Sequence, residues 1–160
     1  MNIRTSPFPR WLCIGATLVA VSACGADGND ALGSGAAAAA AAPAAGTQVV
    51  NASETEWQIV ADRTTVKAGE VTFTATNKGS FNHELLVIRT DLPLGAFAIG
   101  DDGKFNEDDE STLNVAESGE YEVGLTKTFT AKLKPGKYQL VCNIPNHYQN
   151  GMHIEFTVTA

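Results

Sequence analysis

Three residues near the C-terminal end of the chain have the types and spacing of a metal site. Cys142, His147 and Met152 follow one another in a C-x4-H-x4-M pattern, which places a thiolate, an imidazole and a thioether in sequence. Soft sulfur ligands combined with imidazole favour copper. In blue copper sites two histidines and a cysteine form a trigonal plane, and a methionine binds at a longer axial distance. The pattern therefore predicts a copper site that still lacks one histidine.

His83 is the candidate for that second histidine. It stands at the start of an apolar run, 85–88, that is expected to form a strand buried on both faces. His153 directly follows Met152, and side chains alternate along a strand, so His153 should point away from the metal as a surface or packing residue.

The segment that must position these residues, 56–160, has the pattern of an all-β domain. Short runs rich in Val, Thr, Phe and Tyr recur between Gly, Pro and Asn, and no apolar pattern with the helical period is sustained. Cys142 would end one strand, and Met152 would immediately precede the last. We expect strands at 57–60, 71–76, 85–88, 129–133, 138–142 and 153–159.

The first 23 residues have the organisation of a lipoprotein signal peptide. Two arginines precede an apolar stretch, 11–21, which is too short to cross a bilayer because crossing takes about 20 residues. The stretch runs into Val-Ser-Ala-Cys at 21–24, which resembles the bacterial lipobox, in which the cysteine is acylated and becomes the new N-terminus. The sequence therefore predicts lipidation at Cys24; ordinary signal cleavage beside a chance cysteine is the alternative.

Residues 24–55 are expected to form the lipidated N-terminus and a flexible, disordered linker. Ala, Gly and small polar residues dominate this stretch, so it has little to bury. Cys13 would leave with the signal peptide and Cys24 would be acylated, which leaves Cys142 as the single thiol of the domain at 56–160. A lone thiol outside the cytoplasm has no internal disulfide partner, so a metal ligand explains it better than a buried structural cysteine.

The segment 91–120 fits the strand pattern less well. Acidic residues cluster between 101 and 110, and we expect a solvated insertion, because the alternating ligand spacing of an EF-hand calcium loop is missing. The formal net charge of the chain is −7, which argues against nucleic acid as a partner. A redox partner with a basic docking face fits this charge, and we expect the domain to be a monomer.

The domain resembles the cupredoxins, the type 1 (blue) copper proteins of plastocyanin and azurin type. The resemblance covers essentially all of 56–160, and its loop spacing is most similar to that of rusticyanin and auracyanin. Three pieces of sequence carry it: the run AGEVTF at 68–73 with Asn77 and NHE at 82–84, the turn LKPGKY at 133–138, and the loop from Cys142 to Met152.

The resemblance implies a Greek-key β-sandwich of seven or eight strands with copper near one end. It implies His83, Cys142 and His147 as equatorial ligands and Met152 as the axial ligand, because Met152 stands where the family's loop ends. Gln149 is the alternative axial ligand, since some family members use a glutamine.

The resemblance also has implications for the surroundings of the ligands. In the family, electrons pass through the edge of the histidine that corresponds to His147, and we expect Ile144, Pro145 and Tyr148 to form an apolar rim around it. Many members have Asn or Ser directly after the first histidine, where this chain has Glu84. We therefore expect Asn82 or Asn143 to link the two ligand segments, with the side chain of Glu84 pointing away from the metal.

These features predict a lipid-anchored protein that carries single electrons between redox partners, on the cell membrane or outer membrane and outside the cytoplasm. Copper delivery or sequestration is the alternative function. Sites that exchange copper are usually rich in exposed Met or His, whereas this domain has one methionine and three histidines. An enzyme is not expected, because an additional copper would need further histidines and only His153 is left over.

Overall fold

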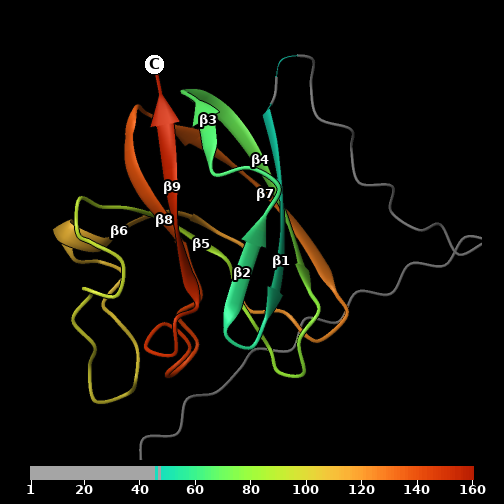
Figure 1. Cartoon of the computed structure of the whole chain (residues 1–160), viewed down its shortest axis with the longest axis vertical. Helices are drawn as coiled ribbons and strands as arrows, with labels where there is room; N and C mark the ends of the chain where they lie inside the picture. Colours follow the sequence, from blue (N-terminus) through green and yellow to red (C-terminus); the bar gives the residue numbers. More distant parts are fainter. Residues whose placement is uncertain (1–45, 47) are drawn as a thin grey trace, which may run out of the picture. The chain divides into compact units, whose positions relative to one another are not determined.

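A computed structural model of the chain describes Gly46 and residues 48–160 (Figure 1). The predicted signal peptide, the lipidation site Cys24 and most of the predicted linker lie outside the described residues. Within the described part of the chain, no helix has the length and apolar character needed to cross a membrane.

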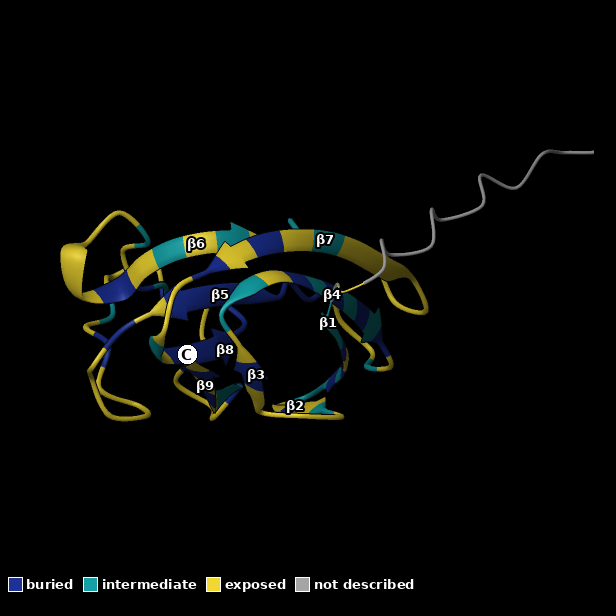
Figure 2. Ribbon diagram, turned by 90° about the horizontal axis from the view of Figure 1, so that it is seen from above, coloured by how far each residue is buried: buried dark blue, intermediate teal, exposed yellow. Residues whose placement is uncertain are grey.

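The described residues form two β-sheets packed as a sandwich, which confirms the predicted all-β class (Figure 1). The four-stranded sheet has the order β2-β1-β4-β7, made of β1 (Gln48–Thr55), β2 (Gln58–Ala61), β4 (Gly69–Asn77) and β7 (Thr126–Leu133). The five-stranded sheet has the order β3-β9-β8-β5-β6, made of β3 (Thr65–Lys67), β5 (Leu86–Arg89), β6 (Leu113–Glu117), β8 (Gly136–Val141) and β9 (His153–Thr159). The edge strands β6 and β7 lie beside each other, so the sheets meet along one side (Figure 2).

Strand β1 corrects the predicted boundary between linker and domain. The sequence predicts a linker up to residue 55, but β1 pairs antiparallel with β2 and parallel with β4. Val50 is fully buried and Ala52 is nearly so, which means that one face of the strand belongs to the core. Small and polar residues fill most of β1, so its hydrophobic signal is weak. With β1 included, and with β6 forming after the acidic segment, the described residues contain nine strands instead of seven or eight.

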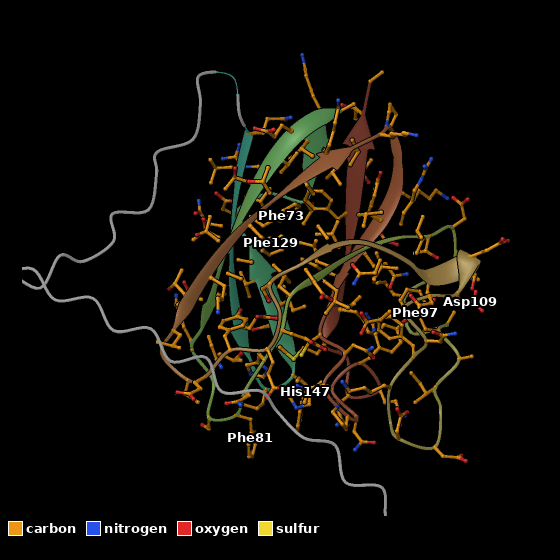
Figure 3. All side chains as sticks on the ribbon, turned by 180° about the vertical axis from the view of Figure 1, so that it is seen from behind. Phe73, Phe81, Phe97, Asp109, Phe129 and His147 are labelled. Atoms are coloured by element: carbon orange, nitrogen blue, oxygen red, sulfur yellow. The ribbon has the colours of Figure 1, made fainter. Side chains whose placement is uncertain are left out.

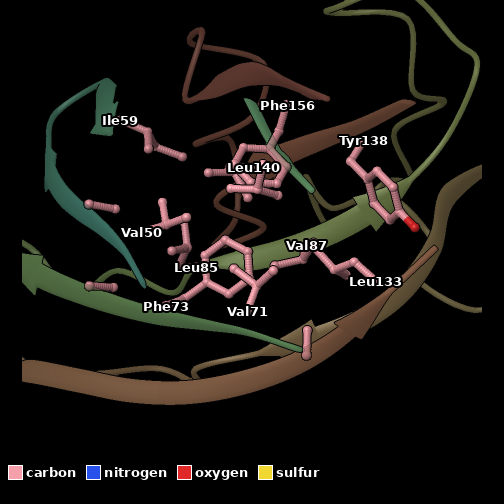
Figure 4. Close-up of a cluster of buried hydrophobic side chains, with 14 of the residues drawn as sticks. Val50, Ile59, Val71, Phe73, Leu85, Val87, Leu133, Tyr138, Leu140 and Phe156 are labelled. Atoms are coloured by element: carbon pink, nitrogen blue, oxygen red, sulfur yellow. The ribbon is translucent and has the colours of Figure 1, made fainter. Parts of the chain in front are cut away.

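The core between the sheets follows the two-residue period of the strands. On β4, Val71, Phe73 and Ala75 are fully buried, whereas the threonines between them face outward and pair with threonines of β7. Phe73 stacks on Phe129 at a ring-centroid distance of 5.3 Å. It also tilts against Phe156 at 5.7 Å (Figure 4). Alternate burial of this kind holds the two sheets in register.

Strand β5 is buried on both faces, as its apolar run predicted (Figure 2). Leu85 and Val87 contact the core between the sheets, whereas Leu86 and Ile88 contact a second, smaller cluster. The strand therefore holds the position of His83 from two sides.

The acidic segment is only partly a solvated insertion. Phe97 and Phe105 are buried and pack around Tyr148, with ring centroids 4.7 Å and 5.5 Å from it. The acidic residues near the short 3-10 helix η1 (Glu110–Thr112) remain exposed, as Asp109 shows in Figure 3. Aromatic residues thus anchor the segment beside the loop that carries His147, and this corrects the expectation of a purely solvated insertion.

Candidate metal centre

His83, Cys142 and His147 come from distant parts of the sequence and meet in the structure. Their potential ligand atoms all lie within 4.8 Å of one another, and all three residues are buried. The two Nδ1 atoms are 3.3 Å apart. Cys142 Sγ lies 3.4 Å from the Nδ1 atom of His147 and 3.9 Å from that of His83. The structure therefore brings together the three residues that the sequence selected as equatorial ligands.

The loop after β8 is closed by hydrogen bonds between its own ends. The N–H of Cys142 donates to the carbonyl of Met152, and the N–H of Met152 donates to the carbonyl of His147, both at 3.1 Å. Asn146 has a φ of 69°, in the left-handed region that asparagine adopts more easily than most residues. This turn directs the following His147 ring back toward Cys142.

His83 is held by backbone pairing with Tyr121 and by a buried asparagine. The N–H of His83 donates to the carbonyl of Tyr121 at 3.2 Å, and the N–H of Tyr121 donates back at 2.9 Å. Asn77 ends β4, and its amide donates to the carbonyls of Phe81 at 2.8 Å and Tyr121 at 3.2 Å while its oxygen accepts from the N–H of Gly79. Asn77 thus closes the loop that leads to His83.

The two candidates for the axial position differ in burial. Met152 is fully buried and directly follows the loop, whereas Gln149 is exposed. His153 is half-buried, and its ring tilts against the Tyr148 ring at 4.7 Å, so it packs as expected. Burial thus favours Met152 over Gln149.

The sulfur of Cys142 lies in an environment that raises its pKa. Burial raises the pKa of the thiol to about 12, and hydrogen bonds from the backbone N–H groups of Glu84 and Ile144 oppose this shift. Glu84 therefore serves the site through its backbone. Burial raises the pKa of the Glu84 carboxyl group to about 7. The positive charge of Lys104 opposes this shift, and the negative charges of Glu107, Glu117 and Glu120 add to it.

The two asparagines that were expected to link the ligand segments form hydrogen bonds elsewhere. Asn82 donates to the carboxylate of Glu120 at 2.8 Å. Asn143 accepts from the N–H of Phe105 at 3.0 Å, donates to its carbonyl at 3.1 Å and donates to Glu107 at 2.7 Å. Asn143 therefore fastens the cysteine segment to the acidic segment.

The surroundings of His147 correct the predicted rim. Tyr148 is buried in the second, smaller cluster together with Phe97 and Phe105, so it does not belong to the rim. Trp57, in the turn between β1 and β2, packs edge-on against the His147 ring with centroids 4.9 Å apart. Trp57 is 39% exposed, whereas His147 is only 5% exposed. Phe81, which is also exposed, lies toward the same end as His147 (Figure 3).

Sequence reasoning missed Trp57 because 90 residues separate it from His147, and no local pattern connects them. The sequence also predicts Trp57 as the first residue of a strand, whereas the structure places it in the two-residue turn between β1 and β2.

The three ligand atoms suit a cation. Burial lowers the pKa of both His83 and His147, which keeps the rings neutral and able to donate a lone pair. Two such lone pairs repel at close range unless a proton or a cation lies between them. A cation at about 2.0 to 2.3 Å from nitrogen and sulfur would hold ligand atoms roughly 3.3 to 3.9 Å apart at angles near trigonal. The three distances here span that same range, so the residues fit a trigonal metal.

Comparisons with known proteins give one family match and several fold matches. Residues 53–160 match the sulfocyanin (SoxE) domain. No curated protein sequence matches the chain. Reduced auracyanin from the photosynthetic bacterium Roseiflexus castenholzii is 23% identical with a TM-score of 0.55, over 74% of this chain and 100% of that one. Rusticyanin from Thiobacillus ferrooxidans is 22% identical with a TM-score of 0.56, over 71% of this chain and 77% of that one.

A third similar structure is auracyanin A from Chloroflexus aurantiacus, which is described as a "blue" copper protein. It is 22% identical with a TM-score of 0.52, over 71% of this chain and 100% of that one. These likenesses show a shared fold.

Proposed function

Since the chain belongs to the sulfocyanin (SoxE) domain family of cupredoxins, we propose that it binds one type 1 copper ion and carries single electrons between redox partners. The observation that carries this proposal is the convergence of three buried ligand atoms from His83, Cys142 and His147. We assign these residues as the equatorial ligands. We assign Met152 as the axial ligand, because it is fully buried at the end of the loop, whereas Gln149 is exposed.

Copper would supply the one-electron redox chemistry, and the chain would keep the ligands in place. Hydrogen bonds hold each ligand segment: Asn77 closes the loop before His83, and backbone bonds join the two ends of the loop from Cys142 to Met152. Burial excludes water from the ligand atoms. A site held this way changes little between oxidation states, so electron exchange needs little reorganisation.

Burial of the ligands supports a carrier over a protein that delivers copper. His83, Cys142 and Met152 are fully buried, and His147 is 5% exposed. An acceptor protein cannot reach such ligands without opening the loop. The experiment is to reduce the copper-loaded chain and add a Cu(I) chelator. Reversible reduction with copper retained supports the carrier, whereas rapid loss of Cu(I) to the chelator would favour delivery.

We also infer that the chain is not itself an enzyme. Within the described part of the chain, His83, Cys142 and His147 form the one cluster in which three or more His, Cys or acidic ligand atoms converge. His153 packs against Tyr148 and is therefore not positioned to build a second copper site with other histidines.

Membrane attachment is a further part of the proposal. The apolar stretch 11–21 and the Val-Ser-Ala-Cys sequence support acylation of Cys24 and a position outside the cytoplasm, on the cell membrane or the outer membrane. The net charge of −7 supports a partner with a basic docking face. Cys24→Ser should move the protein from the membrane fraction to the soluble fraction, and unchanged retention would refute the anchor.

The copper site itself is tested by colour. The chain loaded with Cu(II) should be intensely blue, because charge transfer from the Cys142 thiolate to copper absorbs visible light. Cys142→Ser should be colourless, while Cys24→Ser serves as the matched control and should stay blue. A colourless wild-type protein, or a blue Cys142→Ser variant, would contradict the assignment.

A further inference from the structure

A single two-residue turn contacts both histidines of the site from outside. Strand β1 ends at Thr55 and β2 begins at Gln58, so Glu56 and Trp57 form the turn. Trp57 packs on the His147 ring, as described above. Glu56 approaches the other histidine: its Oε1 atom lies 3.4 Å from Nε2 of His83.

This contact lies at a buried nitrogen that needs a partner. His83 is fully buried, and within the described residues its Nε2 atom makes no regular hydrogen bond. The Glu56 carboxylate is the charged acceptor placed beside it. A carboxylate repels the lone pair of a bare nitrogen and attracts an N–H, so it favours the tautomer with the proton on Nε2. In that tautomer the lone pair of His83 Nδ1 faces Cys142 and the metal position.

The Glu56 carboxylate is itself held in place. Its Oε1 atom accepts hydrogen bonds from the backbone N–H groups of Ser80 at 2.6 Å and Phe81 at 3.0 Å. The two hydrogen bonds therefore fix the carboxylate on the loop that precedes His83.

Gly79 leaves the space that this contact requires. A Cβ atom at Gly79 would lie 2.4 Å from Glu56 Oε1 and 2.7 Å from His83 Nε2. Both distances are far shorter than van der Waals contact, so any side chain here would push the carboxylate and the ring apart. The absence of a side chain at Gly79 therefore allows Glu56 and His83 to approach each other.

We propose that Glu56 is a positioning residue for the copper site, holding His83 in the tautomer that presents Nδ1 and lowering the reduction potential through its negative charge. The proposal rests on the copper function proposed above. A carboxylate that accepts a hydrogen bond from a ligating imidazole makes that ligand more basic. A nearby negative charge stabilises Cu(II) more than Cu(I), because the attraction scales with the charge of the ion.

The test compares Glu56→Gln with Glu70→Gln in the full chain. The glutamine amide oxygen at position 56 can still accept from Ser80 and Phe81, so the loop keeps its bonds while the charge is lost. Glu70→Gln removes an exposed carboxylate at the start of β4, the strand whose other end leads toward His83. We expect Glu56→Gln to raise the reduction potential above that of both the wild type and Glu70→Gln. Each tenfold loss of Cu(II) affinity relative to Cu(I) corresponds to about 59 mV.

A second variant perturbs the same contact without changing charge. Gly79→Ala keeps Glu56 but displaces it from His83, and it should also raise the potential. Either variant left at the wild-type potential overturns the proposal.

A metal-free measurement separates this proposal from the copper function. Nitrogen NMR of the His83 ring should show the Nε2 proton in the wild type and a mixture of tautomers in Glu56→Ala, which has no acceptor oxygen at position 56. Identical tautomers in the two proteins would overturn the proposal even if copper binds as expected. Failure of the wild type to bind copper would refute the proposed function, and the redox role of Glu56 with it.

Discussion

The Nδ1 atoms of His83 and His147 lie 3.3 Å apart, although 64 positions separate the two residues in the chain. Each ring is buried and kept neutral by burial, so the fold directs two nitrogen lone pairs at one point. Such an arrangement is unfavourable by itself and becomes favourable when a cation fills the point. The closeness of the two nitrogens is therefore the structural basis of the predictions on copper.

The first prediction concerns the axial ligand. Met152→Gln should keep the blue colour and lower the reduction potential, because an amide oxygen is a harder donor than a thioether and stabilises Cu(II). Gln149→Ala is the control, since Gln149 is exposed on the same loop and should change neither property. Voltammetry measures the reduction potential, and visible absorption measures the colour. A larger change of the reduction potential in Gln149→Ala than in Met152→Gln would show that Gln149 is the axial ligand.

The second prediction uses Trp57 as a reporter. The chain has two tryptophans, and Trp11 lies in the predicted signal peptide, so Trp57 is the single tryptophan after cleavage. Because its ring lies 4.9 Å from the His147 ring, Cu(II) should strongly quench its fluorescence. Zn²⁺, which has no redox chemistry, should bind with little quenching and provides the control. Fluorescence that is indifferent to Cu(II) in a blue protein would show that Trp57 does not cover His147 in solution.

The third prediction is a pH dependence set by Glu54. This residue is fully buried, accepts a hydrogen bond from the Tyr121 hydroxyl, and has its pKa raised from 4.5 to about 8 by burial. Between these values the folded chain binds a proton that the unfolded chain releases. The free energy of unfolding should therefore fall as pH rises through this window, by at most about 1.4 kcal/mol per pH unit.

The window from about pH 7 to 8 separates this effect from the histidines and from Glu84, whose pKa is raised by burial to about 7. Burial lowers the pKa of His83, His147 and His153 below 6.5, so they destabilise the fold only as the pH falls below that value. Glu54→Gln keeps an acceptor for Tyr121 and should flatten the slope in urea unfolding of the metal-free chain, whereas Glu70→Gln should keep it. An unchanged slope in Glu54→Gln would assign the pH dependence to another group.

The fourth prediction concerns the attachment of the acidic segment. Asn143→Ala removes both hydrogen bonds to the Phe105 backbone and the one to Glu107, and it leaves buried groups without partners. The free energy of unfolding should drop by about 1 to 3 kcal/mol. Asn150→Ala, at an exposed position of the same loop, should cost much less. Equal losses in the two variants would mean that the segment does not depend on Asn143.

Much of the site could be predicted because ligand chemistry depends on residue type and local spacing. The interval between Cys142, His147 and Met152 lies within one loop, and strand periodicity places that loop between β8 and β9 without knowledge of the fold. His83 was the candidate for the second histidine, the family resemblance implied its role as an equatorial ligand, and the structure places it beside Cys142. Strong two-residue alternation likewise predicted β4, and an unbroken apolar run predicted β5.

The environment of the ligands was decided only by the tertiary structure. Strand β1 has little hydrophobic signal, and its pairing with β4 brings Val50 into the core. That pairing brings the turn with Glu56 and Trp57 onto the two histidines, and aromatic packing around Phe97 draws Tyr148 inward from the predicted rim. The ligand types are thus properties of the local sequence. The groups that cover the ligands and set their charge come from strand pairings between distant segments, which local patterns do not encode.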